Sequence, residues 1–368
     1  MKKFRYKNLF IYSSLQSVGH VDDYFVQNTE KLLVFLVMPR LKNKFNIVRL
    51  YNKGKIKEEK KVPSSSNVFL YYFLWYFSQQ YFIFKYFSKK ESFILFGGHP
   101  ICFFGMSVIK LMRKCEYAYW IGDYFPGNGI IIKAFERVKK FYHNKISYTF
   151  YLSDRINKIM NNNKILETNN RKTVMWGIQS RKMKREVHAK EFSLLFVGLI
   201  KDSQGLEFFY DFLKSNKDYS LSILGLCDDY LYKKYQEIIK KYNIGKRVFF
   251  PNKFFSDKEL FEFSKNCHVG VALYNIDKSN PTYYTDPGKV KTYAELGLPI
   301  LMSNTSAIAT YIDKFSAGEI ITRKFDSVKL ALKKIKREYK KYLMGVEDFN
   351  SYFDYKIYYK EKFICLEK

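Results

Sequence analysis

Short apolar runs alternate with amphipathic segments through the second half of the sequence. The segments between the runs carry helix signals, such as Ser256 followed three residues later by Glu259, the pattern of a capping box. The apolar runs are SLLFV at 193–197, SLSIL at 220–224, RVFF at 247–250, HVGVALY at 268–274, PILM at 299–302 and EII at 319–321. Short apolar strands separated by helices predict a parallel sheet with helices on both faces.

The first half repeats this alternation less regularly. Its apolar runs are LFIYSS at 9–14, KLLVFLVM at 31–38, FNIVRLY at 45–51, FILF at 93–96, YAYWI at 117–121, ISYTFYLS at 146–153 and TVMW at 173–176. A basic run separates the two halves and consists of Arg181, Lys182, Lys184 and Arg185. The pattern predicts an α/β protein with two doubly wound, Rossmann-like domains facing a cleft, in which ligands bind at the carboxyl ends of the strands.

The predicted domain boundaries follow from these runs. We expect an N-terminal domain over residues 1–180, a C-terminal domain over 190–340, and a helical segment over 341–368 that packs back on the N-terminal domain.

An aromatic segment at 68–87, VFLYYFLWYFSQQYFIFKYF, is long enough to suggest a membrane span. Ser78, Gln79, Gln80 and Lys85 interrupt it, whereas a span requires about 20 predominantly apolar residues. This pattern favours a helix that packs within the first domain. Contact of its aromatic side chains with a bilayer, and a true span, are the alternatives.

The charge of the chain is strongly basic and unevenly distributed. The 368 residues include 64 Lys and Arg against 35 Asp and Glu, a formal net charge of +29. Residues 1–189 hold 34 of these basic and 12 of these acidic side chains, so most of the excess lies in the first half. AT-rich codons would raise the basic content overall, but they explain the difference between the halves less easily. We therefore predict that the first half faces an anionic partner, such as a membrane surface. Nucleic acid is not among the partners that we expect.

Cysteine usage and the N-terminus favour the cytoplasm. The five cysteines form no CxxC pair, and their odd number excludes complete pairing, as is typical of a reducing compartment. The N-terminal apolar stretch is short and has no small-residue cleavage site, so we expect no export signal. Together with the charge, this predicts a cytoplasmic protein that is peripheral on the inner face of the cell membrane.

The clearest local signal for chemistry begins with Asp286, Pro287, Gly288 and Lys289. Asp286 can cap a helix and Pro287 suits its first turn. Lys289 and Lys291 would then oppose the helix macrodipole, which favours anions at that end by ~0.3–1 kcal/mol. A phosphate bound by the helix N-terminus and Lys289 explains this arrangement. The alternative is a pair of solvated lysines beside a well-capped helix.

This segment resembles the PxKxxEYxxxGxP region of the group 1, or family 4-like, retaining glycosyltransferases. Other stretches resemble family motifs in the same order: VMWGIQ at 174–179, LLFVGLIKDSQGLE at 194–207, LSILG at 221–225 and RVFFPNKFFSDKEL at 247–260. The resemblance covers about residues 174–322 by motif and the first half only by architecture.

The resemblance implies the two-domain GT-B fold, in which the N-terminal domain binds the acceptor and the C-terminal domain binds the nucleotide sugar. It implies transfer of a hexose from a nucleotide diphosphate sugar to a hydroxyl group. The anomeric configuration would be retained, and no metal ion would be required. It also implies a set of donor-binding residues: Gly198, Lys201, Gly205, Asp286, Pro287, Gly288, Lys289 and Tyr293. We expect the acceptor to be a glycan or a lipid-linked molecule in surface polysaccharide or glycolipid synthesis.

Four positions depart from the family pattern. Leu199 and Gln204 stand where the family has Arg and Lys, so Lys201 is the only cation in that loop. Tyr284 and Thr292 stand where the family has a pair of glutamates. The nearest carboxylates able to substitute are Asp286 and Glu295. These departures leave open a GT-B protein that binds a sugar nucleotide without catalysis.

Three strand-end loops of the first half offer candidate catalytic groups. We predict that Asp123, after YAYWI, activates the acceptor hydroxyl or stabilises the reacting centre, because this loop resembles the place of an acceptor-side His or Asp in the family. His99, after FILF, is predicted to orient donor phosphate or acceptor, and His20 has weaker support. A turn aspartate and a satisfied loop histidine are the alternatives.

Motifs for other chemistry are missing from the sequence. It has no Asp-x-Asp, HExxH, clustered Cys and His, GxGxxG opening a helix, or GxxxxGK[ST], which argues against a catalytic metal, a dehydrogenase and a P-loop enzyme. Backbone amides with Lys201 and Lys289 would then carry the charge of a leaving diphosphate. A basic membrane-binding or nucleic-acid-binding protein remains the alternative from another class.

Overall fold

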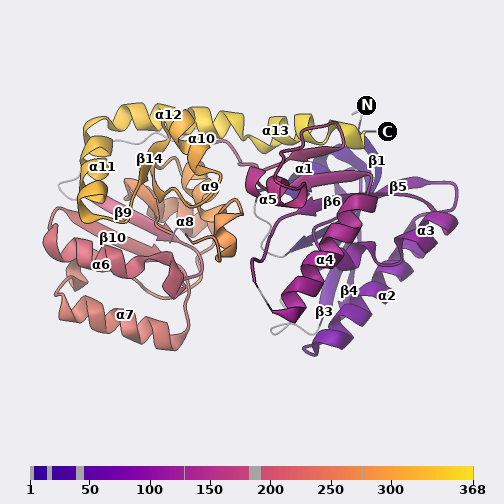
Figure 1. Cartoon of the computed structure of the whole chain (residues 1–368), viewed down its shortest axis with the longest axis horizontal. Helices are drawn as coiled ribbons and strands as arrows, with labels where there is room; N and C mark the ends of the chain where they lie inside the picture. The colour runs from indigo at the N-terminus through magenta and orange to yellow at the C-terminus, as the bar shows by residue number, and fades with distance from the viewer. Residues whose placement is uncertain are drawn as a thin grey trace. The chain divides into compact units, whose positions relative to one another are not determined.

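The chain forms two compact units (Figure 1). The computed structural model describes residues 4–14, 19–38, 45–127, 129–181, 192–274 and 277–367. The first unit comprises Met1–Gly177 and Tyr355–Lys368, and the second comprises Ile178–Asp354. Each unit is built on a parallel or largely parallel sheet with helices packed on it, so the predicted class of two doubly wound α/β domains is confirmed.

The C-terminal segment expected at 341–368 is shared between the units. Its residues up to Asp354 belong to the second unit, and the remainder belong to the first. Of the basic run between the halves, Lys182, Lys184 and Arg185 lie outside the described residues.

An eight-stranded sheet forms the centre of the first unit. Its strand order is β4-β3-β2-β1-β5-β6-β7-β8, and neighbours are parallel except where β3 pairs with β2 and β4. The strands are β1 (Tyr6–Ser14), β2 (Thr29–Val37), β3 (Phe45–Asn52), β4 (Lys55–Pro63), β5 (Ser92–Gly97), β6 (Lys114–Ile121), β7 (Tyr148–Tyr151) and β8 (Arg171–Thr173). Since β1 leads to β2 on one side and β5 leads to β6 on the other, the connections diverge between β1 and β5.

The hairpin of β3 and β4 was not expected from the apolar pattern. Lys53 and Gly54 form its turn and both have positive φ, 51° and 80°, as a type I′ turn requires. β4 has the sequence KIKEEKKVP and buries only Val62, so it has no apolar face for a pattern to detect. The run at 45–51 therefore forms an antiparallel strand instead of another parallel one.

Helices cover both faces of this sheet. Right-handed connections put α2, α3 and α4 on one face and α1 on the other, where α1 packs against α13. Both α2 and α4 contact the short 3-10 helix η1 that precedes α3. The helices are α1 (Val21–Asn28), α2 (Val68–Tyr86), η1 (Pro100–Phe103), α3 (Met106–Met112), α4 (Ile130–Lys145), α5 (Asp154–Met160), α13 (Tyr355–Lys362) and η5 (Ile364–Leu366).

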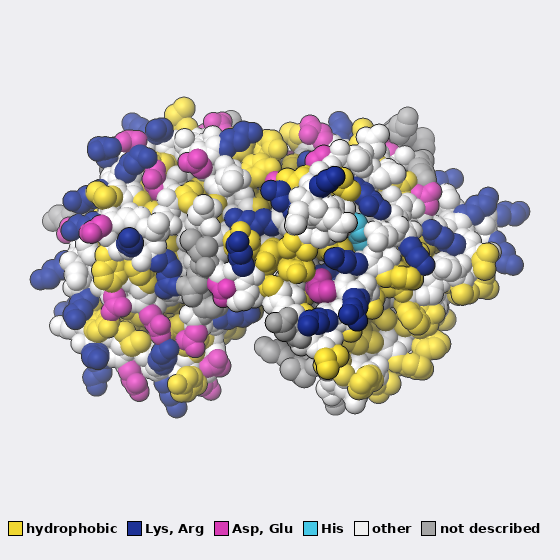
Figure 2. Space-filling model, viewed as in Figure 1, with side chains coloured by type: hydrophobic (Ala, Val, Ile, Leu, Met, Phe, Trp, Pro, Cys, Tyr) yellow, Lys and Arg dark blue, Asp and Glu magenta, His cyan; other side chains and the backbone are white. Residues whose placement is uncertain are grey.

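The aromatic segment forms the single helix α2, as predicted. Asn67 caps it by accepting hydrogen bonds from the backbone N–H groups of Phe69 and Leu70, at 3.0 and 3.1 Å. One side of the helix, including Trp75 and Phe82, is buried, whereas the other is exposed, and hydrophobic side chains gather over this part of the first unit in Figure 2. No helix in the described part of the chain is both long enough and apolar enough to cross a membrane.

The end of the chain completes the core of the first unit. Phe363 packs among Phe25, Phe96 and Phe150, with ring centroids 5.3, 5.6 and 5.0 Å away. The hydroxyl of Tyr359 donates to the Gly19 carbonyl at 2.6 Å and accepts from the Gly177 N–H at 2.7 Å. These contacts join the first and last segments of the unit.

A six-stranded, fully parallel sheet forms the centre of the second unit. Its order is β11-β10-β9-β12-β13-β14. The strands are β9 (Phe192–Val197), β10 (Tyr219–Leu224), β11 (Val248–Phe249), β12 (Val269–Ala272), β13 (Ile300–Ser303) and β14 (Gly318–Ile321). Their positions match the predicted runs.

The helices of the second unit follow its strands in turn. They are η2 (Asp202–Gln204), α6 (Leu206–Ser215), α7 (Asp229–Lys241), η3 (Gly245–Arg247), α8 (Asp257–Ser264), η4 (Pro281–Tyr283), α9 (Gly288–Glu295), α10 (Ala309–Lys314), α11 (Phe325–Arg337) and α12 (Tyr339–Tyr352). The predicted capping box opens α8, where Ser256 and Glu259 exchange hydrogen bonds.

We expect Tyr359→Phe to destabilise the first unit and leave the second unchanged. The substitution leaves a buried N–H and a buried carbonyl without their partner, which costs ~1–3 kcal/mol for each unsatisfied group. The protein's three tryptophans, Trp75, Trp120 and Trp176, all lie in the first unit, so their fluorescence during urea unfolding reports on that unit. Tyr230→Phe, at an exposed position in the second unit, is the matched control. An unchanged fluorescence midpoint in Tyr359→Phe would show that these hydrogen bonds do not hold the unit together.

Candidate functional site

The connections of the second sheet diverge between β9 and β12. From β9 the chain moves to β10 and β11 on one side, and it returns to β12, β13 and β14 on the other. In open α/β sheets, ligands bind beyond the carboxyl ends of the strands at such a point. The loops after β9 and β12 are therefore the first place to look for a nucleotide site.

Lys289 reaches this point from the first turn of α9. Its Nζ atom is buried and lies 3.7 Å from the ring centroid of Phe196 on β9 and 5.5 Å from that of Tyr274, which follows β12. No hydrogen-bond partner for Nζ is present among the described residues. Burial lowers the pKa of Lys289 to about 7. Burial disfavours the charged form of an amine that has no hydrogen-bond partner, and a bound anion would favour that form again.

Lys291, two residues further along, has a different environment. Its Nζ lies 3.6 Å from the Asp286 carboxylate and 3.1 Å from the ring centroid of Phe353. Burial lowers the pKa of Lys291 to about 8, against the opposing effect of Asp286. Since both ammonium groups are buried, the alternative of two solvated lysines is wrong.

Asp286 lies one residue before the N-cap of α9. Pro287 occupies the N-cap position, so the prediction that Asp286 is the N-cap residue is wrong. The proline fixes the backbone before Gly288, and the buried Asp286 carboxylate turns to Lys291 instead. The geometry thus gives Asp286 a pairing role inside the unit.

Tyr293 packs beneath the same point and is fully buried. Its hydroxyl donates to the Val271 carbonyl at 2.8 Å and accepts from the Val197 N–H at 3.2 Å. A Cβ atom at Gly270 would lie 2.2 Å from the tyrosine ring, so only glycine fits there. Tyr293 therefore fastens β9 to β12, and this geometry favours a positioning role over direct contact with a nucleotide.

The loop between β9 and α6 contains the other predicted donor contacts. Gly198 and Gly205 both have positive φ, 102° and 75°, and the Lys201 side chain is exposed. The Lys201 N–H donates to Gln204 Oε1 at 3.3 Å, so Gln204 shapes the loop where the family has a cation. A Cβ atom at Gly205 would lie 2.6 Å from the Leu273 carbonyl, which brings the N-terminus of α6 against the end of β12.

Arg323 is a residue that the sequence analysis missed. It follows β14, and its Nη2 would lie 3.5 Å from a Cβ atom at Gly205, the N-cap of α6. A cation beside a helix N-terminus is unfavourable unless an anion joins it. Its place directly after the predicted strand at 319–321 is the signal that could have found it.

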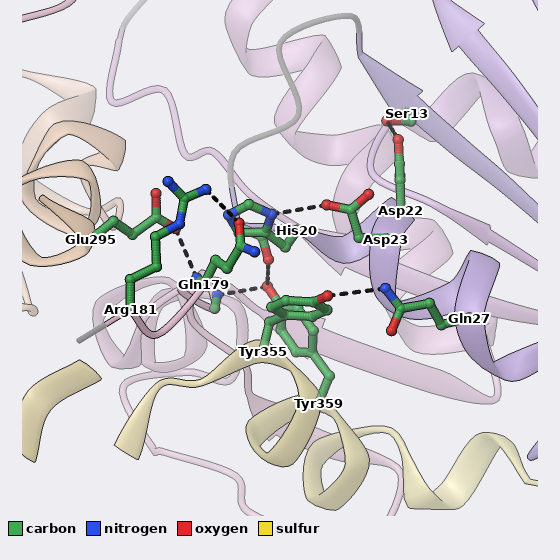
Figure 3. A network of polar contacts seen from close by, with 12 residues as sticks. Ser13, His20, Asp22, Asp23, Gln27, Gln179, Arg181, Glu295, Tyr355 and Tyr359 are labelled. Carbon is green, nitrogen blue, oxygen red and sulfur yellow. Dashed lines mark hydrogen bonds and ion pairs between the residues drawn. The ribbon is translucent and has the colours of Figure 1, made fainter. Parts of the chain in front are cut away.

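Glu295, one of the two possible substitute carboxylates, is engaged elsewhere in the second unit. It accepts a hydrogen bond from the Gln179 N–H at 2.9 Å, and Arg181 donates to the Gln179 side chain at 2.8 Å (Figure 3). Thr292 is one of the two residues that stand where the resembled family has glutamate, and its hydroxyl donates to the Gly288 carbonyl inside α9. This arrangement ties Glu295 to the backbone at the start of the unit.

A cavity of 350 Å³ lies at the carboxyl ends of β1, β5 and β6 in the first unit. The point where that sheet's connections diverge is again between β1 and β5. The cavity is lined by Tyr12, Ser13, Val21, Asp22, Val37, Trp75, Phe96, Gly98, His99, Trp120, Gly122, Asp123 and Trp176. His99 and Asp123, predicted from two separate loops, thus line one cavity.

His99 is held as a neutral hydrogen-bond donor. Its Nδ1 accepts from the Ile101 N–H at 3.2 Å, so the ring proton of the neutral form is on Nε2. The ring lies 5.4 Å from Tyr72, 5.5 Å from Trp75 and 5.4 Å from Phe135, centroid to centroid. Burial, with a smaller effect of the Lys139 charge, lowers the pKa of His99 to about 4.

Asp123 is positioned by a buried ion pair that the sequence analysis did not find. Lys139 donates to the Asp123 carbonyl and, at 2.9 Å, to Glu136, which in turn accepts from the Phe125 N–H at 3.2 Å. Burial raises the pKa of Asp123, opposed by the Lys139 charge. The pair is three residues apart within a basic helix, where it looks like an ordinary surface pair.

Asp22 and His20 occupy different places near the first strand. Asp22 lines the cavity, accepts a hydrogen bond from Ser13, and has its pKa raised to about 6 by burial (Figure 3). His20 bonds Asp23 through Nδ1 at 2.9 Å and stacks on Tyr355. It is not among the residues found to line the cavity. The described ranges contain no group of three or more His, Cys, Asp or Glu that could hold a metal ion.

The sequence matches no family model and no curated protein. Solved structures, however, match nearly the whole chain. Sucrose-phosphate synthase from Thermosynechococcus elongatus matches with a TM-score of 0.70 and 11% identity, over 97% of both chains. The lipopolysaccharide outer core galactosyltransferase WaaB in its apo form matches with 0.65 and 15%, over 97% of this chain and 99% of that one. HepE of Anabaena in complex with UDP matches with 0.64 and 11%, over 96% and 98%. The chain therefore has the GT-B fold.

Lys289→Met and Lys291→Met should change the stability of the second unit in opposite directions. The pKa of Lys289 is lower in the folded than in the unfolded state. Below about pH 7 folding therefore buries a charged amine, which lowers the free energy of unfolding. This loss of stability diminishes as the pH rises from about 7 toward the unfolded pKa. Lys289→Met should therefore be more stable than wild type at pH 6.5 by at least ~1 kcal/mol, with a difference that shrinks toward pH 10. Lys291→Met removes the ammonium group that pairs with the buried Asp286 carboxylate and should cost ~3–5 kcal/mol.

The measurement is urea unfolding followed by far-ultraviolet circular dichroism. Because all the tryptophans lie in the first unit, the transition that is absent from tryptophan fluorescence is assigned to the second unit. If Lys289→Met loses stability at pH 6.5 as Lys291→Met does, then Lys289 is a structural lysine.

Proposed function

We propose that this chain is a glycosyltransferase that moves a sugar from a nucleotide diphosphate donor to a hydroxyl group of a glycan or lipid-linked acceptor. The single observation that carries the proposal is the buried Lys289 amine at the point where the second sheet's connections diverge, in a chain with the GT-B fold over its whole length. Two similar structures contain a bound nucleoside diphosphate: HepE of Anabaena is in complex with UDP, and starch synthase IV of Arabidopsis thaliana is bound to ADP.

The donor's diphosphate would bind between the first turns of α6 and α9. A bound phosphate would favour the protonated form of Lys289, which would then pair with it. Arg323 would supply a second cation, in place of those missing at Leu199 and Gln204. Helix N-termini favour phosphate through their free N–H groups. No metal ion is needed to balance the diphosphate when two cations and these amides surround it.

In the reaction, the bond between the sugar's anomeric carbon and the diphosphate oxygen breaks, and the acceptor oxygen forms a bond to the same carbon. The leaving diphosphate keeps the electron pair, and the acceptor's proton leaves to a base. Asp123 is the group proposed to stabilise the reacting centre or take this proton, since its raised pKa brings it closer to the working pH. His99 would donate its Nε2 proton to a substrate oxygen and hold it in place. Retention of configuration is part of the proposal.

The proposed setting is surface polysaccharide or glycolipid synthesis, in the cytoplasm and peripheral to the inner face of the membrane. It is supported by the concentration of positive charge in residues 1–189.

A second candidate is a GT-B protein that binds a sugar nucleotide without turnover. It is favoured by the departures from the family pattern at Leu199, Gln204, Tyr284 and Thr292. Titration with UDP, ADP and other nucleoside diphosphates, followed by slow hydrolysis of the matching sugar nucleotide, separates the two: tight binding with no hydrolysis supports the second.

Lys289→Met should weaken binding of the matching nucleoside diphosphate ten- to a hundredfold, because a hydrogen bond to a charged group contributes ~1.5–3 kcal/mol. Binding of the bare nucleoside should stay within about twofold, as expected for a change confined to charge. Arg323→Gln should act in the same direction. Wild-type affinity for the diphosphate should also fall as the pH rises above about 7, because the amine must take up a proton to bind. Calorimetric titration measures all of these, and an equal loss for nucleoside and diphosphate would contradict the assignment.

Asp123→Asn should lower turnover by about 10²–10⁴-fold with donor affinity nearly unchanged, since the residue lies on the first unit and acts in proton transfer or charge stabilisation. Turnover is measured as release of nucleoside diphosphate from the donor identified by titration. Turnover at the wild-type level would make His99 the next residue to test.

A further inference from the structure

The outer side of α2 is an exposed aromatic stripe. Phe69, Phe73, Phe77 and Tyr81 are spaced four residues apart, which places them on one side of a helix, opposite buried residues such as Trp75. Phe69 is 84% exposed. Such a stripe on a helix that already packs its other side has no partner within the described part of the first unit.

The neighbouring segments extend this stripe into a broad surface. Leu111 on α3 is 88% exposed, and Ile130 and Ile131 at the start of α4 are 87% and 85% exposed. Phe104 joins them to α2, with its ring 5.1 Å from that of Tyr76. We call the exposed side of α2, Phe104–Met112 and α4 the apolar face. Soluble monomers rarely expose contiguous apolar surface of this kind unless it binds something.

The charged side chains on the helices of the apolar face are mostly basic. The exposed cations are Lys85, which pairs with Glu58 at 3.3 Å, Lys110, Lys133, Arg137, Lys140 and Lys145. The only acidic residue of these helices is Glu136, which is bonded to Lys139 and to the Phe125 N–H. Lys145 lies over the ring of Phe141, 4.0 Å from its centroid, so its stem covers an aromatic ring.

We propose that the apolar face docks the first unit on an anionic lipid bilayer. Aromatic side chains with interspersed Lys and Arg have the composition of an interfacial surface, in which rings enter the headgroup region and cations meet anionic lipids. A second copy of the chain is a poorer occupant, because a symmetric dimer through this face would bring like charges together.

The apolar face also adjoins the cavity that contains His99 and Asp123. α2 contributes Trp75 to the cavity and Phe73 to the face, and Phe125, two residues after Asp123, is exposed. Docking through this face would hold the cavity at headgroup level. The acceptor hydroxyl is then one carried by a lipid within the bilayer, a conclusion that rests on the proposed function.

Vesicle co-sedimentation of the full chain tests the docking. Binding to vesicles of phosphatidylcholine with phosphatidylglycerol is expected at low salt, should fade as salt rises, and should be weak with phosphatidylcholine alone. Each cation near an anionic surface multiplies binding roughly fivefold, so Lys133→Glu with Lys140→Glu should reduce it at least thirtyfold. Ile130→Ser with Ile131→Ser should reduce it at least tenfold.

Matched controls lie on α11 of the second unit. Lys329→Glu with Lys333→Glu makes the same charge change, and Leu330→Ser removes an exposed apolar side chain; neither should alter binding by more than about twofold. An equal loss in the control and test variants would overturn the proposal. So would absence of binding to either vesicle, or self-association in sedimentation velocity that the test variants abolish. Because vesicle binding needs no donor sugar, its failure would leave the transferase proposal to be judged by hydrolysis alone.

Discussion

The hydroxyl of Tyr293 holds the two central strands of the second unit together at the point where its connections part. It bridges the backbones of β9 and β12, and its ring occupies the space that the missing side chain of Gly270 leaves. α9 is therefore fixed against the sheet, and the first turn of that helix carries Lys289 over Phe196. The position of the proposed phosphate site follows from this contact, because a small shift of α9 would carry the amine away from the ends of both strands.

Within that constraint, the two lysines of α9 show how one helical turn can separate structure from function. Lys291 has an aspartate and an aromatic ring, and its charge is balanced inside the protein. Lys289 lies against the ring of Phe196 and has no hydrogen-bond partner among the described residues, and in the proposed function the donor's diphosphate balances its charge. A buried ion pair is also present in the first unit, where Lys139 bonds Glu136 and the Asp123 carbonyl and so positions the loop that contains Asp123. In both units, a buried pair lies next to a group that has a role in the proposed reaction.

Most strands were predictable, because apolar runs of parallel strands are buried on both faces and stand out in the sequence. The GT-B class was implied by the motif resemblance over about residues 174–322. β4 was not, since an edge strand rich in lysine and glutamate has no apolar side. His99 and Asp123 were predictable as strand-end loop residues, but the tautomer of His99 depends on the Ile101 N–H, which no spacing reveals. Arg323 lies near Gly205, far away in the sequence, and Lys139 reaches the Asp123 carbonyl 16 residues before it. Asp286 was wrongly predicted to be the N-cap residue, and its carboxylate pairs with Lys291 within the helix.

The division of the first unit between the two ends of the chain imposes an order on its assembly. A ribosome makes all of Ile178–Asp354 before it makes the residues that supply Tyr359 and Phe363 to the first unit's core. The second unit thus has every residue it needs while the first is still missing a helix and part of its aromatic centre. The nascent first unit must wait, with its core open, for segments more than 170 residues downstream, so it is the unit expected to depend on chaperones during synthesis.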